Sequence, residues 1–157
     1  MEIKKFKLTK LLEGLDMVST DCSVYMNKST GEFVMITDEL MRTYEKYNDG
    51  SIDGILEWEK NMVDEIREVV DIHPDDYIEL PTSYELHEHK IMENFCYTLQ
   101  DSLKDEFLHA IFKKGAFRRF QQLLIHYRLR DQWFEFKRNA YLKKLVSWCE
   151  SQGVEYE

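Results

Sequence analysis

The sequence predicts an α+β fold, in which a small antiparallel sheet of two or three strands from the N-terminal half accompanies a helical C-terminal half. Two short β-prone segments, Cys22 to Met26 and Phe33 to Ile36, flank a turn with Gly31, which is typical of a hairpin. Beyond residue 82, apolar residues recur every three or four positions, which indicates helices. The chain has 157 residues and no flexible linker, so we expect one domain over residues 1–157.

The N-terminal half contains four further predicted elements. Thr9 is the expected N-cap of the first helix and Asp38 that of the second. Pro74 ends the third helix, and the β-prone segment after it can add a third strand to the hairpin. The elements are a helix over 8–18, a short helix from Asp38 to a turn at 48–50, a helix over 53–71 and a strand over 77–80.

The C-terminal half reads as four helices. Thr82 and Glu85 have the spacing of a capping box, which predicts a helix that runs to about Leu99. Gly115 separates two further helices, and Gly153 is a C-terminal stop for the last one. These three helices are expected over 101–112, from about 116 to 127, and over about 131–150.

The charge of the chain is unevenly distributed. The formal net charge is −9, which argues against a general nucleic-acid coat. Between Lys113 and Lys144, however, ten Lys and Arg residues accompany two acids, so this segment carries +8 and the remainder −17. Such an asymmetry indicates a binding surface, or two halves that pack on each other.

Cysteine usage and hydropathy favour the cytoplasm. The three cysteines, Cys22, Cys96 and Cys149, are widely spaced and form no CxxC pair, so we expect reduced thiols. The N-terminus has no apolar segment typical of a signal peptide, and no run of residues is long and apolar enough for a membrane span.

A basic segment around Arg118 and Arg119 is the main candidate for a binding site. On a helix, Phe117, Phe120, Leu123, Leu124 and Tyr127 share one arc, which we expect in the core. The opposite side would present Lys114, Arg118, Arg119, Gln122 and His126. This face could contact an acidic protein partner, an anionic ligand or nucleic-acid phosphates, or it could be a solvated surface.

Glu88 is unusual because it falls inside a predicted apolar arc. A carboxylate there needs a cation, unless its pKa is raised and it acts as an acid or base. Arg138 falls inside the predicted apolar arc of the last helix, so it is the first candidate partner for an ion pair. The first arc comprises Tyr84, Ile91, Met92, Phe95 and Leu99, and the second Phe134, Tyr141, Leu142, Leu145, Trp148 and Cys149.

Signals for catalysis are weak. The chain has no GxSxG, P-loop or GxGxxG motif, and we expect no catalytic residue, metal or cofactor. His89 shares a helical stripe with Glu85 and Glu93, but a solvated polar face is the favoured interpretation. A hydrolase-type enzyme around Glu88 and His87 is the least favoured alternative.

Four segments carry a recognisable combination of motifs: Leu86–Phe95, Lys114–Phe120, Trp133–Lys137 and Trp148–Val154. Together they resemble a bacterial uncharacterised protein family, UPF0158. In that family the position of His89 is usually aromatic, and that of Cys149 is often Leu. The family has no established activity, so the resemblance implies a kind of protein and not a mechanism.

We therefore expect a small cytoplasmic binding or regulatory module rather than an enzyme. Its partner would be a protein or an anionic ligand, with nucleic acid on the same face as the alternative. The last helix also has Trp133 and Phe136 outside its main apolar stripe, which could seal a core or a homodimer.

Overall fold

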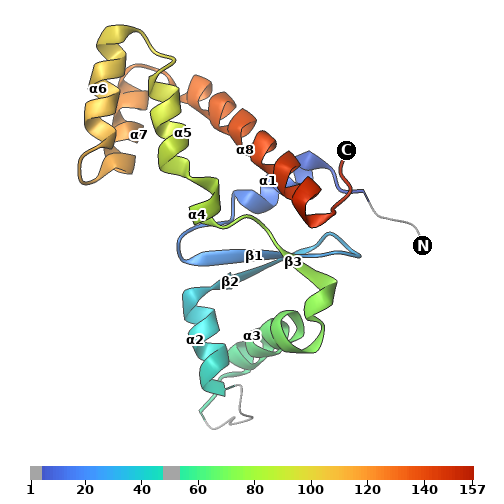
Figure 1. Cartoon of the computed structure of the whole chain (residues 1–157). Helices are drawn as coiled ribbons and strands as arrows, with labels where there is room; N and C mark the ends of the chain where they lie inside the picture. Colours follow the sequence, from blue (N-terminus) through green and yellow to red (C-terminus); the bar gives the residue numbers. More distant parts are fainter. Residues whose placement is uncertain (1–4, 48–53) are drawn as a thin grey trace. The chain divides into compact units, whose positions relative to one another are not determined.

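The computed structural model describes residues 5–47 and 54–157, and the turn predicted at 48–50 lies outside them. The chain divides into two compact units, which are drawn with all elements in Figure 1. The sheet unit comprises residues 1–85 and 148–157, and the helical unit comprises residues 86–147. The predicted α+β class is confirmed, because a three-stranded antiparallel sheet occurs with a helical C-terminal half.

The sheet contains the predicted hairpin, whose first strand is the central one. Strands β1 (Cys22–Asn27) and β2 (Phe33–Thr37) pair antiparallel, and β3 (Tyr77–Glu79) pairs with the other edge of β1, which gives the order β2-β1-β3. Gly31 adopts a φ of 77° in the hairpin loop, a conformation that glycine adopts without steric cost. The predicted third strand is therefore confirmed.

The two faces of the sheet are covered by different helices (Figure 1). Along β1, buried and partly buried side chains alternate, as expected for a strand. Helices α2 (Asp38–Tyr47) and α3 (Glu57–Arg67) form one core with the sheet through Ile36, Tyr44 and Ile66. On the other face, α1 (Leu8–Leu15) buries Leu11 and Leu15.

Two helix caps and the bounds of the third helix differ from the sequence-based predictions. Residue Lys7 precedes α1 without a side-chain cap, so Thr9 is not the N-cap. Before α2, the Leu40 N–H donates to Thr37 Oγ1 at 3.1 Å, so the N-cap side chain is that of Thr37 and not that of Asp38. The predicted helix over 53–71 begins later, at Glu57, and its last turn is a π-helical turn, Glu68–Ile72. A short 3₁₀ turn, Pro74–Asp76, follows.

The two ends of the described chain pair within the sheet unit. The Phe6 N–H donates to the Glu155 carbonyl at 2.9 Å, and the Glu157 N–H donates to the Phe6 carbonyl at 2.9 Å. These bonds tie the segment after α8 to the segment before α1. The last residues of the chain therefore belong to the same folding unit as the first described ones.

The helical unit is formed by α5 (Glu88–Cys96), α6 (Asp101–Ile111), α7 (Ala116–His126) and the first part of α8 (Arg130–Gln152). Its core is an aromatic cluster in which rings meet edge to face, a favoured geometry for aromatic pairs. Phe120 lies 4.8 Å from Trp133 and 5.7 Å from Phe107 between ring centroids, and Phe95 lies 5.4 Å from Trp133.

The helix predicted from residue 82 to residue 99 is broken at His87. The capping box is present, because the Glu85 N–H donates to Thr82 Oγ1 and the Thr82 N–H donates to Glu85 Oε1, both at 3.2 Å. It opens only a short helix, α4 (Ser83–Leu86). His87 has φ 50° and ψ 54°, a left-handed conformation that ends one helix before α5 begins. Tyr84 is 81% exposed, so it does not belong to the apolar arc of α5.

Candidate binding face on the helical unit

The basic segment is positioned by the start of α7. Gly115 precedes this helix with a φ of 77°, so the predicted interruption is confirmed. The Arg119 N–H donates to the Gly115 carbonyl at 3.0 Å in the first turn. Glycine supports this sharp entry because a side chain would be strained at positive φ. The two arginines are therefore placed in the first turn of a regular helix.

The predicted basic face is exposed. All five of its side chains, those of Lys114, Arg118, Arg119, Gln122 and His126, belong to exposed residues. The Arg119 Nε donates to the Lys114 carbonyl at 3.1 Å, which restricts the direction of its guanidinium group. In the part of the chain that the structure describes, no ion pair joins Arg118 or Arg119 to a carboxylate.

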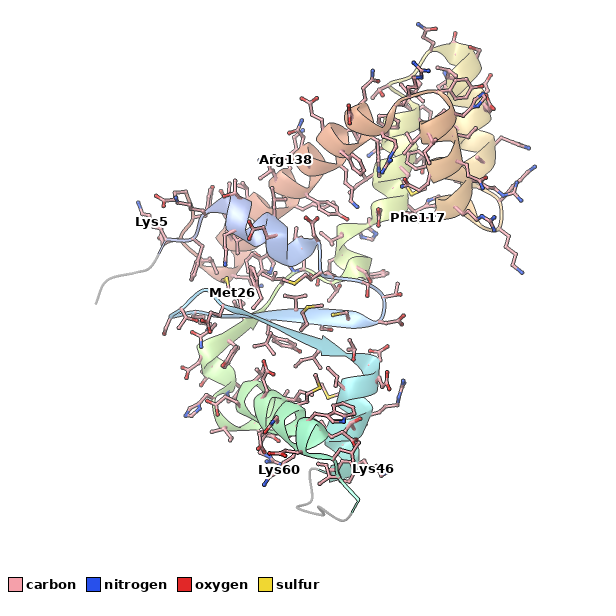
Figure 2. The ribbon with its side chains drawn as sticks, turned by 180° about the vertical axis from the view of Figure 1, so that it is seen from behind. Lys5, Met26, Lys46, Lys60, Phe117 and Arg138 are labelled. Carbon is pink, nitrogen blue, oxygen red and sulfur yellow. The ribbon has the colours of Figure 1, made fainter. Side chains whose placement is uncertain are left out.

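Phe117 does not lie in the core, which corrects the prediction for this residue. Phe120 and Leu124 are fully buried, but Phe117 is 56% exposed at the beginning of α7 (Figure 2). Periodicity alone places Phe117 on the same arc as Leu124, but the first turn of α7 is not covered by neighbouring side chains. The Phe117 ring is therefore exposed in the same first turn of α7 that carries Arg118 and Arg119.

The buried side of α8 also differs from the predicted one in its first half. Trp133, which was placed outside the main stripe, is 1% exposed, and its ring packs on Phe95 and Phe120. Phe134, which was placed inside the stripe, is 49% exposed, and the Arg130 guanidinium lies over its ring. In the first half of α8, the buried side is therefore offset by one residue from the predicted apolar arc.

This offset decides the partner of Glu88. The Lys137 Nζ lies 3.0 Å from Glu88 Oε1, so Lys137 and not Arg138 forms the ion pair. Lys137 follows Trp133 by four positions and shares its side of α8. Arg138 instead follows the exposed Phe134, and Figure 2 shows it on the side of α8 turned away from α5. The side chains of Glu88 and Lys137 are 35% and 27% exposed, so this pair is only partly buried.

His89 is exposed and also makes a structural contact. Its Nε2 lies 2.8 Å from the Ile111 carbonyl oxygen, and because a carbonyl only accepts, Nε2 carries the proton. Its ring also meets Phe112 edge to face at 5.6 Å. His89 thus fastens the end of α6 to α5. Among the described residues, no group of three or more His, Cys, Asp or Glu side chains is arranged to hold a metal ion.

The cysteines lack the features of nucleophiles. All three are free and buried. Burial raises the pKa of the Cys96 thiol to about 11, and burial together with the nearby Glu150 raises the pKa of Cys149 to about 11. Both thiols are therefore protonated near pH 7, whereas a cysteine nucleophile reacts as the thiolate.

These features define a small α+β protein with an exposed basic face on its helical unit. The chain matches the model of the uncharacterised protein family UPF0158 over residues 32–157, and it belongs to this family. The expected resemblance is thereby confirmed. No curated protein and no solved structure matches the chain. Among the described residues, no helix is long and apolar enough to cross a membrane.

Proposed function

We propose that this chain is a binding module whose basic face on α7 (Lys114, Arg118, Arg119, Gln122 and His126) docks an acidic protein partner. One observation carries the proposal: Phe117, Arg118 and Arg119 are all exposed in the first turn of α7. Arginine and aromatic side chains supply much of the binding energy at protein interfaces. The guanidinium groups would bind carboxylates, and the Phe117 ring, exposed in the same turn, would add apolar contact area at the edge of the interface.

The chemistry of arginine supports a carboxylate partner. A guanidinium group can donate two parallel hydrogen bonds to one carboxylate, which gives both strength and a defined orientation. Because Arg119 bonds the Lys114 carbonyl through its Nε, the two terminal nitrogens of its guanidinium group are available for such a pair. The three buried free thiols agree with the cytoplasm as the place of action, because thiols stay reduced there.

The test compares binding by the wild-type chain with binding by Arg118→Glu combined with Arg119→Glu. A partner captured from native extract by the wild type should be lost with this variant, because two attractive charges become repulsive. Phe117→Ala should weaken the same complex without changing its salt dependence. The melting curves should stay unchanged, since all three side chains are exposed.

The matched control is Lys5→Glu combined with Lys60→Glu, which changes the net charge equally on exposed residues of the sheet unit (Figure 2). This variant should retain the partner. An identical set of bound proteins for the arginine variant and the wild type would contradict the proposal. Binding of RNA or DNA pools at low salt, lost steeply as salt rises, would instead favour the nucleic-acid alternative.

A further inference from the structure

A groove between α5 and α8 is a second candidate site, and no residue of α7 lines it. From α5 and the residue before it, His87, Lys90, Ile91 and Asn94 line the groove. These positions are spaced by three, one and three residues, so they form one helical stripe. The two helices meet where Phe95 packs on Trp133 and diverge from that end (Figure 1).

The wall from α8 repeats the same spacing. Phe136, Asn139, Ala140, Lys143 and Lys144 line it. Ala140 lies in the middle of this stripe, and its small side chain leaves space that a larger residue would fill. The groove has a volume of about 510 Å³, which is within the range of sites for small organic ligands.

The floor of the groove is apolar. Ile91 is 3% exposed, and the ring of Phe136 is held by an edge-to-face contact with Phe95 at 5.5 Å between centroids. Such a floor suits a flat apolar group better than a strongly hydrated one. The amides of Asn94 and Asn139 can donate and accept hydrogen bonds at its edges.

The rim of the groove is positively charged. It carries Lys90, Lys143 and Lys144, and no acidic residue is among the lining residues. Lys90 lies 3.6 Å from Glu93, whereas in the described part of the chain no carboxylate forms an ion pair with Lys143 or Lys144. His87 lies at the same rim in its left-handed conformation, and strained residues of this kind are often found at ligand sites.

We propose that this groove binds a small organic anion, in which a phosphate or carboxylate group is joined to a flat apolar body. The apolar body would lie on Ile91, Phe136 and Ala140. The anionic group would meet the ammonium groups of Lys143 and Lys144. This site is separate from the basic face on α7, because the two share no residue.

The first experiment titrates the full chain with phenyl phosphate and follows backbone and side-chain amide signals by NMR. Saturable shifts should be confined to the groove, including the side-chain amides of Asn94 and Asn139. Inorganic phosphate carries only the anionic group of the proposed ligand, and benzyl alcohol only its flat apolar body. Each should therefore bind at least about tenfold more weakly than phenyl phosphate. Equal binding of inorganic phosphate, or no saturable shift up to about 10 mM phenyl phosphate, would overturn the proposal.

Two variants test the apolar floor and the positively charged rim of the groove separately. Ala140→Leu fills the groove without changing the charge, and Lys143→Glu with Lys144→Glu reverses the charge without filling it. Each should weaken phenyl phosphate binding about tenfold or more. The matched control, Lys113→Glu with Lys114→Glu, makes the same charge change on exposed residues outside the groove and should bind normally.

Equal weakening by the control and by the groove lysine variant would show general attraction by lysines and would overturn the proposal. If Ala140→Leu does not fold, as judged by its melting curve, the lysine variants still decide the outcome. The control variant also alters Lys114 of the basic face, so retained phenyl phosphate binding would separate this site from the proposed protein interface.

Discussion

At the scale of single residues, the sheet unit depends on a glycine in its first helix. Gly14 is buried, and a Cβ atom at this position would lie 2.5 Å from Leu80 Cδ1 and 2.8 Å from the Phe33 ring. Leu80 is itself 1% exposed, so it has little space into which it could move. The close approach of α1 to the sheet therefore requires the absence of a side chain.

Gly14→Ala should destabilise the protein by about 1 kcal/mol. Overpacking costs about 1–3 kcal/mol, and the better helix propensity of Ala offsets up to about 1 kcal/mol. Urea unfolding measures the difference. In a Leu80→Val background, which removes the Cδ1 atom, the same change should cost less. An equal cost in both backgrounds would show that the contact with Leu80 is not responsible.

At the scale of elements, the first half of α8 determines both the core and the ion pair. The side of α8 that carries Trp133 packs on α5 and α7, and this brings Lys137 to Glu88. The neighbouring side carries Phe134, with Arg130 over its ring. Lys137, the observed partner of Glu88, and Arg138, the predicted one, are neighbours in the sequence but project from different sides of α8.

Glu88→Gln and Lys137→Met should show a coupling of up to about 1 kcal/mol in a double-mutant cycle. The value is modest because both side chains are about one-third exposed and solvent screens the pair. The control cycle combines Glu88→Gln with Arg138→Met, and its effects should add within about 0.5 kcal/mol. Both cycles are measured by chemical denaturation. Coupling in the Arg138 cycle alone would contradict the observed pairing.

The break between α4 and α5 is also a feature of the arrangement of elements. Apolar spacing continues across His87, and the segment contains neither Gly nor Pro, so no local signal marks an interruption. The capping box was predictable because it is a local pattern of two side chains. The left-handed conformation of His87 was not predictable, because Gly, Asn and Asp are the residues that routinely adopt it and His is not one of them.

At the scale of the whole molecule, opposite charges belong to different parts of the sequence. The segment from Lys113 to Lys144, with its net charge of +8, lies within the helical unit. The net charge of −9 therefore does not exclude an anionic partner, because the local net charge of this segment has the opposite sign. Both proposed sites use cations of this segment.

The single-domain organisation remains a prediction, and it can be tested on the full chain. We expect one cooperative unfolding transition, because α8 runs without interruption from the helical unit into the sheet unit and contributes residues to both. Differential scanning calorimetry gives the measurement. The calorimetric and van't Hoff enthalpies should agree. Two resolved transitions would show instead that the units unfold independently.

By itself, the sequence determined the α+β class, the hairpin, the third strand, the capping box and the exposed basic side of α7. These features depend on patterns within a few neighbouring residues, such as alternation, helical periodicity and turn glycines. Only the tertiary structure decided that Trp133 is buried and Phe134 exposed, that Phe117 is uncovered, and that Lys137 pairs with Glu88. The physical reason is that periodicity defines an apolar arc only to within about one residue. The neighbouring helices then select which side chains on that arc they cover.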